Sequence, residues 1–263
     1  MKNLNLFAIL LVALLMVQCQ DEGIEEFQQA KDPIPEEIIN GLNAMGFNTV
    51  DYEVLQKKEG YLVEGDIIIP TKTILNATTT SAKHRRAANI LSCDAARRVT
   101  VKNNIPSINN LVRDAVNSWN EVVNSSLRVR LVRTGNADIN INREIGNAGS
   151  GRFPTADGRP GPVIEIDPAL YDVLPANQRT QVLRFVLRHE IGHNIGFGHT
   201  NQNDPGSSHI EGTPMNDSRS TMNAQAHAVL NGNIDVSLFQ SGTLSQQDII
   251  AVRQLYPANR VCQ

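Results

Sequence analysis

The sequence lacks a long basic run, and it lacks aromatic residues interleaved with basic ones. Since the formal net charge is also −3, nucleic acid is excluded as an expected partner. Beyond the first 17 residues no stretch is apolar enough to cross a membrane, and no internal repeat is visible. The composition that remains, 41% hydrophobic and 19% charged among 263 residues, is typical of a globular protein with one good core or two modest domains.

The first residues have the pattern of an export signal. Lys2 is followed by an uninterrupted apolar run over residues 6–17, which is too short to span a bilayer and suits a signal peptide. The alternative is a short N-terminal core helix. Residues 15–19 (LMVQC) resemble the lipobox of bacterial lipoproteins. The resemblance implies that residues 1–18 are removed, that Cys19 carries lipid, and that the protein sits in the cell envelope as an outer-membrane or surface lipoprotein; without a lipobox it would be secreted.

Three cysteines leave an odd one in an exported protein. If Cys19 takes lipid, Cys93 and Cys262 remain to form a disulfide. A bridge that closes so long a loop would stabilise the fold by up to about 5 kcal/mol in the chain-entropy model. The alternative for this pair is two buried thiols.

Composition divides the rest of the chain. Residues 19–35 are polar and acidic and indicate a tether, and residues 36–75 indicate a small α+β segment with a helix over 36–45 and a strand over 61–69 that ends at Pro70. Residues 76–90 have linker composition and include the dibasic pair Arg85-Arg86, a candidate cleavage region. Residues 91–263 form the larger expected domain. Its patterns predict helices over 108–123, 180–195 and 245–256, strands from 97 to 101 and over 127–132, 137–142 and 163–166, and a loop with five glycines over 146–161.

The strongest signal in the sequence is H-E-x-x-H-x-x-G-x-x-H, which begins at His189. Residues four apart on a helix share a face, so the imidazoles of His189 and His193 can bind one ion. Glu190 can reach a metal-bound water without being a ligand, and Gly196 permits the backbone turn that brings His199 to the site as third ligand. Three neutral imidazoles leave a fourth zinc position open, which is the pattern of a catalytic site.

This motif resembles that of the metzincin zinc proteases, and its first five residues, HEIGH, resemble the bacterial dual-action HEIGH metallopeptidases. Residues 220–223 (STMN) resemble the metzincin Met-turn, with Met222 lying 23 residues after His199. The position two residues after the methionine, a tyrosine in some metzincins, is Ala224 here. The resemblance implies an α+β fold with a twisted mixed sheet, an active-site helix, a Met-turn and a C-terminal helix.

Two further features resemble matrixins, one strand-like (residues 137–141) and one at the start of the last helix (residues 244–249). In matrixins the aspartate that matches Asp248 steadies the Met-turn. The alternative is that Asp248 only caps its helix, since it also stands at the capping-box position after Ser245. Structural calcium is a further expectation by resemblance, although the sequence has no clear calcium loop.

We therefore expect a monomeric zinc endopeptidase that acts on protein or peptide substrates, with one catalytic Zn²⁺ and Glu190 as general base. The alternative is an inactive zinc-binding surface lipoprotein that acts as a binding module. Some metzincin prodomains block the zinc with a cysteine and others with an acid. Residues 36–75 contain no cysteine, so Asp66 is the candidate for such a block. The alternative for this segment is a spacer that lifts the enzyme off the membrane.

Overall fold

The computed structural model describes residues 33–45, 47, 49–50, 52–76, 86–200, 208–213, 217, 219–224 and 242–262. The predicted signal peptide, Cys19 and nearly all of the predicted tether lie outside these residues. The chain divides into residues 1–33 and the compact unit Ile34–Gln263, and the description below concerns the second unit. No helix in its described part is long and apolar enough to cross a bilayer.

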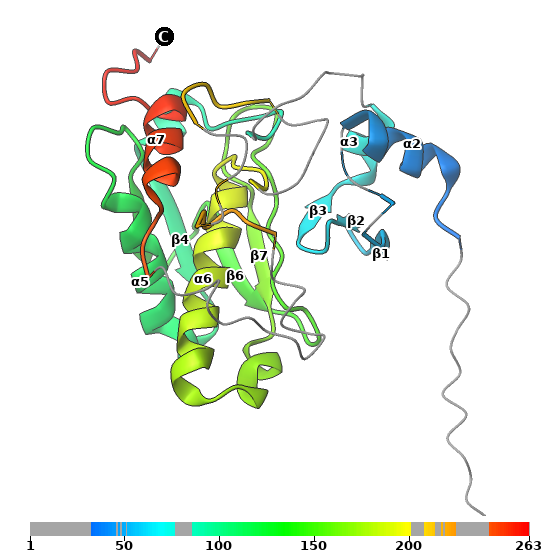
Figure 1. Cartoon of the computed structure of the whole chain (residues 1–263), viewed down its shortest axis with the longest axis horizontal. Coiled ribbons are helices and arrows are strands. Elements are labelled where there is room, and N and C mark those ends of the chain that lie inside the picture. The colour runs from blue at the N-terminus through cyan, green and yellow to red at the C-terminus, as the bar shows by residue number, and fades with distance from the viewer. Residues whose placement is uncertain are drawn as a thin grey trace, which may run out of the picture. The chain divides into compact units, whose positions relative to one another are not determined.

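The elements follow one another in the order shown in Figure 1. The first part of the unit contains α2 (Glu36–Met45), β1 (Leu55–Lys57), β2 (Gly60–Val63), β3 (Ile67–Ile69) and α3 (Thr71–Leu75). The second part contains α4 (Cys93–Ala96), β4 (Val99–Asn103), the 3-10 turn Pro106–Ile108, α5 (Asn109–Asn120), β5 (Val129–Val132), β6 (Ile139–Arg143), β7 (Val163–Ile166), the 3-10 turn Pro168–Val173, α6 (Ala176–Asn194) and α7 (Gln246–Leu255).

The larger sheet has the strand order β5-β4-β6-β7, and its named strands are parallel. An isolated antiparallel bridge between Ser150 and Glu165 adds the segment after β6 to its edge, next to β7. The fold is α+β, and α5 and α6 lie over one face of this sheet (Figure 1). The glycine-rich loop between β6 and β7 therefore runs along the sheet edge.

The main core lies between the sheet and these two helices. Strand residues that alternate toward the helices, such as Val99, Val101, Ile139 and Ile141, are fully buried. The apolar face of α5 ends at Trp119, whose indole N–H donates to the Arg188 carbonyl of α6 at 3.1 Å. This bond satisfies the one polar group of a buried indole and joins α5 to α6 one residue before His189.

The first part of the unit has a small core of its own, built from α2, α3 and the three-stranded antiparallel sheet β1-β2-β3. The sequence pattern predicts one strand over residues 61–69, and this prediction is wrong because the chain reverses after Val63. Glu64 and Gly65 have φ angles of +47° and +82°, and together with Asp66 they form the three-residue connection between Val63 and its partner Ile67. The apolar runs on either side are two antiparallel strands, β2 and β3.

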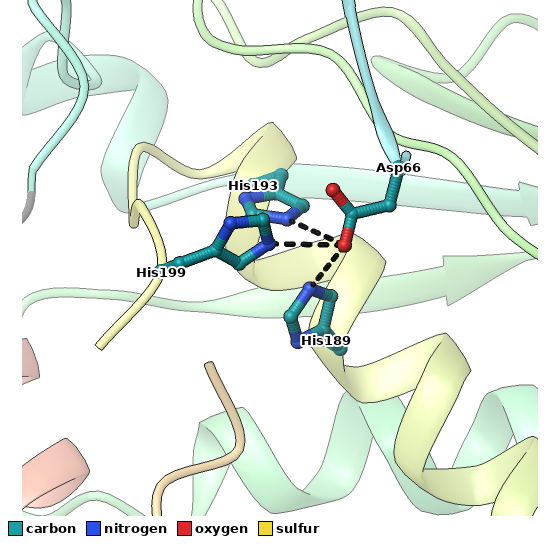
Figure 2. A group of neighbouring side chains, drawn as sticks. All are labelled: Asp66, His189, His193 and His199. Atoms are coloured by element: carbon teal, nitrogen blue, oxygen red, sulfur yellow. Dashed lines mark hydrogen bonds and ion pairs between the residues drawn. The ribbon is translucent and has the colours of Figure 1, made fainter. Parts of the chain in front are cut away.

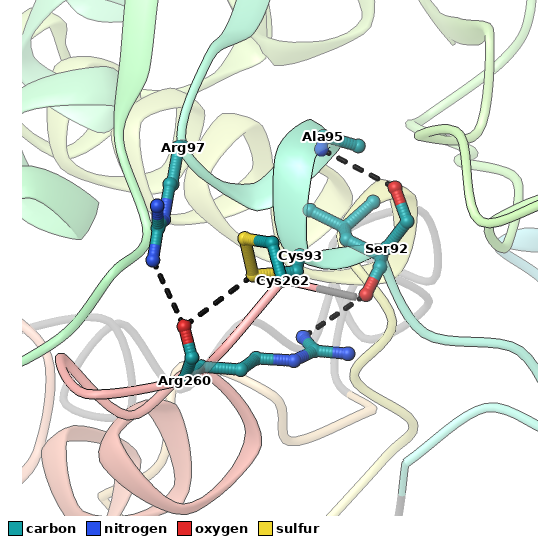
Figure 3. Close-up of a disulfide and its surroundings, with 7 residues drawn as sticks. Ser92, Cys93, Ala95, Arg97, Arg260 and Cys262 are labelled. Carbon is teal, nitrogen blue, oxygen red and sulfur yellow. Dashed lines mark hydrogen bonds between the residues drawn. A yellow bond between two sulfur atoms is a disulfide. The ribbon is translucent and has the colours of Figure 1, made fainter.

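A disulfide joins Cys93 at the start of α4 to Cys262 near the C-terminus (Figure 3). The Cα atoms lie 5.3 Å apart, within the usual range for a disulfide. The same end of the chain is held by a bond of 2.9 Å from an Arg97 guanidinium N–H to the Arg260 carbonyl, and by one of 3.1 Å from the Arg260 guanidinium to the Leu91 carbonyl. The two ends of the predicted catalytic domain are thereby joined.

Candidate metal centre

The last turns of α6 present His189 and His193 on one face. The His189 Nδ1–H donates to the Thr221 carbonyl at 2.7 Å, and the His193 Nδ1–H donates to the Phe197 carbonyl at 2.8 Å. Because a carbonyl can only accept, each Nδ1 carries the proton and each Nε2 has its lone pair available for a metal.

Helix α6 ends before Gly196, whose φ of +104° lies in the region that favours glycine. The ring of Tyr256 packs against this turn, and its hydroxyl donates to the Ile195 carbonyl and accepts from the Leu91 N–H. After the turn, His199 lies opposite the two helical histidines and is fully buried.

A carboxylate from the first part of the unit stands among the three imidazoles (Figure 2). Asp66, the last residue before β3, places Oδ2 3.1 Å from His189 Nε2, 3.0 Å from His199 Nε2 and 3.8 Å from His193 Nε2. Among the described residues, these four side chains form a group that could hold a metal ion, with ligand atoms all within 4.8 Å of one another.

The geometry of the group fits zinc. Two ligands bound at about 2.1 Å in a tetrahedral site lie about 3.4 Å apart, and the three Asp66 distances scatter around that separation. His193 Nε2 and Asp66 Oδ1 are buried and have no hydrogen-bond partner in the structure. Buried polar atoms without a partner are rare in proteins, and a metal ion would provide the missing partner. Three imidazoles and one carboxylate are ligands that zinc binds in proteins.

The charges within the group shift one another's pKa values. Burial lowers the pKa of His193 to about 4, with a further contribution from His189. Burial also lowers the pKa of His199, but the carboxylates of Asp66 and Glu64 outweigh it and hold that pKa well above its usual value. Burial raises the pKa of Asp66, but the charge of His199 and the contacts with the three histidines outweigh burial and hold that pKa well below its usual value. Asp66 and His199 thus stabilise each other's charged forms.

Glu190 lies beside this group and makes none of its bonds. Its side chain is fully buried, and neither Oε1 nor Oε2 has a hydrogen-bond partner in the structure. Burial, followed by the charge of Asp66, raises the pKa of Glu190 well above its ordinary value. A Cβ atom on Gly149 or Gly151 would come within 3.1 Å of one of its carboxylate oxygens, so glycines at these positions let the sheet edge lie close to Glu190.

The sheet edge also binds the first part of the unit. The Gly151 N–H donates to the Asp66 carbonyl at 2.8 Å, and the Gly151 carbonyl accepts from the Ile68 N–H at 3.1 Å. The Arg152 guanidinium, only 7% exposed, donates to Glu59 at 2.8 Å. Main-chain pairing to this edge therefore brings Asp66 to the histidines.

Met222 is buried, with its sulfur against Gly192, the helix residue between Ile191 and His193 in the HEIGH sequence. A Cβ atom on Gly192 would lie 2.3 Å from the Met222 sulfur and 3.1 Å from the Trp119 ring. The glycine of HEIGH thus lets the methionine turn pack directly on α6.

Replacing Gly192 by alanine is expected to lower the free energy of unfolding by about 1–2 kcal/mol. Alanine favours a helix interior by about 1 kcal/mol, but overpacking a closed core costs about 1–3 kcal/mol, and the tight Trp119 contact limits relaxation. Urea denaturation measures the difference. Gly242→Ala is the control because a Cβ atom there meets nothing within 4 Å. A Gly192→Ala protein as stable as the parent would contradict this packing.

Asp248 makes both of the contacts considered from the sequence. It accepts from the Ser220 hydroxyl at 2.6 Å and the Thr221 N–H at 2.9 Å, which fixes the methionine turn. It also forms a capping box with Ser245 at the start of α7. Since Thr221 in turn holds His189 through its carbonyl, Asp248 connects the C-terminal helix to a histidine of the metal centre.

We expect Asp248→Ala to lower the free energy of unfolding by about 2–4 kcal/mol. The change removes a helix cap worth about 1 kcal/mol and buried hydrogen bonds to a charged group worth about 1.5–3 kcal/mol each, partly compensated by relaxation. Asp172→Ala, which breaks the exposed ion pair with Arg179, should change stability by less than about 1 kcal/mol. Equal effects of the two substitutions in thermal or urea unfolding would show that Asp248 has no special role.

Reasoning from sequence missed Glu64 and Asn194. Asn194 donates to the carbonyls of Gly161 and Val163 and so ties the end of α6 to the glycine-rich loop. Glu64 Oε2 lies 2.9 Å from His199 Nδ1. Glu64-Gly65 between two apolar runs is a signal that could have predicted the turn, but nothing in the sequence pairs Glu64 with His199.

The chain is similar to one protein family and to several solved structures. The profile of the dual-action HEIGH metallo-peptidase family matches residues 62–256, and no curated protein matches the chain. A structure of myroilysin matches with 14% identity and a TM-score of 0.43 over 63% of this chain and 95% of its own. The hatching-enzyme zinc-protease HCE-1 of medaka fish, Oryzias latipes, matches with 16% identity and a TM-score of 0.41 over 67% of this chain and 98% of its own. Since the family profile covers well over half of the sequence, the chain belongs to the dual-action HEIGH metallo-peptidase family, and it is a zinc metallopeptidase.

Proposed function

We propose that the chain is an endopeptidase that hydrolyses internal peptide bonds of proteins, with Glu190 as general base. The observation that carries the proposal is the buried Glu190 carboxylate, which has no hydrogen-bond partner and lies beside three convergent imidazoles. A structural carboxylate at this depth would be paired. An unpaired one is suited to accept a proton during a reaction. In the alternative, an inactive zinc-binding lipoprotein, the Glu190 carboxylate would have no function.

His189, His193 and His199 would hold the zinc ion through their Nε2 atoms. When bound, zinc supplies Lewis acidity, which lowers the pKa of a water and polarises the scissile carbonyl. Glu190 takes a proton from the attacking water as the new C–O bond forms, and delivers it to the amine nitrogen as the C–N bond breaks. No covalent bond to the enzyme is needed.

An extended peptide suits the sheet edge at Gly151. Its N–H and carbonyl already pair with the main chain of Asp66 and Ile68, so the edge accepts a strand without regard to side chains. Main-chain pairing supports a protein or peptide substrate held next to the metal centre.

We further propose that residues 36–75 are an inhibitory prosegment and that Asp66 blocks the zinc. Support comes from Asp66 Oδ2, whose distances of 3.0, 3.1 and 3.8 Å to the three Nε2 atoms suit a fourth ligand that binds in place of water. The pairing at Gly151 also fills the edge that a substrate would use. Activation then requires cleavage in the linker before Arg86. Beyond that point the chain is fixed to the site, because the Ala87 N–H donates to the Gly196 carbonyl at 2.9 Å.

Product mapping tests the endopeptidase. A site for a sequence-specific protease is inserted within residues 77–85, the folded chain is cut there, and the prosegment is separated. Incubation with casein followed by mass spectrometry should give internal fragments. Release of single terminal residues alone, or intact casein, would contradict the proposal.

The envelope location is proposed from residues 15–19 alone. Lipid on Cys19 predicts that the chain made in a bacterium with lipoprotein processing fractionates with membranes, and that Cys19→Ala releases it. A parent protein recovered in the soluble fraction would favour simple secretion.

A further inference from the structure

The side chain of Glu64 is buried at the metal centre from a backbone position that disfavours glutamate. Its φ of +47° lies in the left-handed region, where a residue other than glycine costs about 1 kcal/mol or more. Glycine would relieve that strain, as the neighbouring Gly65 does at φ +82°. Only 1% of Glu64 is exposed, so its carboxylate also bears a large desolvation cost. Glutamate here therefore needs a compensating contact.

His199 provides such a contact. Glu64 Oε2 lies 2.9 Å from His199 Nδ1, while Asp66 Oδ2 lies 3.0 Å from Nε2 of the same ring. Two carboxylates from one turn of the prosegment thus contact both nitrogens of the same imidazole. The other two histidines are oriented differently, since their Nδ1 atoms donate to the Thr221 and Phe197 carbonyls of the catalytic domain.

We propose that Glu64 is a positioning residue for the zinc ion, so that the prosegment completes the metal centre as well as blocking it. By accepting the Nδ1 proton, Glu64 fixes the tautomer that presents Nε2 of His199 to the metal. Outer carboxylate partners of this kind typically change metal affinity by about 10–100-fold. The latent chain then binds zinc more tightly than the processed enzyme, and release of the prosegment loosens the metal. This inference rests on the zinc site of the proposed function.

Zinc affinity of the full-length chain, measured by competition with a chromophoric chelator, tests the inference without any assay of activity. Glu64→Gly removes the carboxylate and relieves the strained backbone, so the chain should stay folded while the zinc dissociation constant rises about 10–100-fold. Glu64→Gln keeps an oxygen that can accept the Nδ1 proton and should show a smaller rise. Glu59→Gln breaks another prosegment contact, the one with Arg152, and should leave the dissociation constant unchanged.

Displacement of Asp66 could also lower affinity, and a double variant separates the two effects. In an Asp66→Ala background, adding Glu64→Gly should still raise the dissociation constant about tenfold, because the effect acts through His199. Cutting the linker and removing the prosegment should raise it as well.

Unchanged affinity in Glu64→Gly, or an effect that disappears in the Asp66→Ala background, would overturn the inference and leave the peptidase untouched. A zinc affinity that depends on Glu64, in a protein that cleaves no substrate, would support the inference and contradict the proposed peptidase activity. A parent chain that binds no zinc would overturn both.

Discussion

The processed Glu190→Gln enzyme is expected to hydrolyse casein about 10²–10⁴ times more slowly than the parent, because general acid–base catalysis contributes rate factors of that size. Glutamine has the shape of glutamate but cannot take a proton from water. Glu190 makes no bond to the three histidines, so zinc content should stay at the parent's level. Initial rates and metal analysis on the same samples measure both quantities.

The matched control is Glu144→Gln, the same change at the residue after β6, whose carboxylate accepts from Asn147 and does not contact the metal centre. It should keep most of the activity. A Glu190→Gln enzyme with parental rates, or one that has lost its zinc, would show that Glu190 is not the general base.

The full-length Asp66→Asn chain is expected to be active before any cut in the linker, at a rate at least about tenfold above the uncut parent. Asparagine is a weaker partner for both the histidines and the metal. A hydrogen bond to a charged group contributes about 1.5–3 kcal/mol, which corresponds to about 10–100-fold in the balance between blocked and open sites. Peptide hydrolysis by uncut chains measures the ratio.

Asp157→Asn is the control for this experiment because Asp157 forms an exposed ion pair with Arg159 in the glycine-rich loop. It should leave the uncut chain latent. If uncut Asp66→Asn is no more active than the uncut parent, Asp66 does not maintain latency and the spacer interpretation of residues 36–75 is favoured.

The helices could be predicted closely from the sequence. The helix over residues 36–45 has the bounds of α2, and the one over 180–195 differs from α6 mainly at its start. Helix α2 buries one face through Ile38 and Leu42, so the 3.6-residue period appears directly in the sequence. Helix α6 is buried on all sides over residues 185–194, so its second half is marked by the zinc motif and not by a polar face. The spacing of the zinc motif likewise reflects one helix followed by one glycine turn, and the fold brings those histidines together.

The strand prediction over residues 61–69 failed for a physical reason. Both β2 and β3 are buried on both faces, so the sequence shows two apolar runs without alternation, and Glu64 is an unusual residue for the turn between them. Asp66 is the predicted zinc block only by resemblance to other prodomains and because residues 36–75 contain no cysteine.

Contacts that depend on close backbone approach could not be predicted. In the sequence, the glycines at positions 149, 151 and 192 are ordinary loop or helix glycines. Only the packing shows that the first two permit a close contact with Glu190 and the third a close contact with Met222. The Glu64–His199 pair joins residues 135 apart along the chain, a separation over which local patterns carry no information.

The most direct test of the account is a zinc titration of the processed, metal-free enzyme with casein hydrolysis as the readout. We predict no hydrolysis without metal, a linear rise as zinc is added, and a plateau at one zinc ion per chain. Binding of one zinc ion per chain with no hydrolysis at any point would contradict the account and identify the protein as a zinc-binding module.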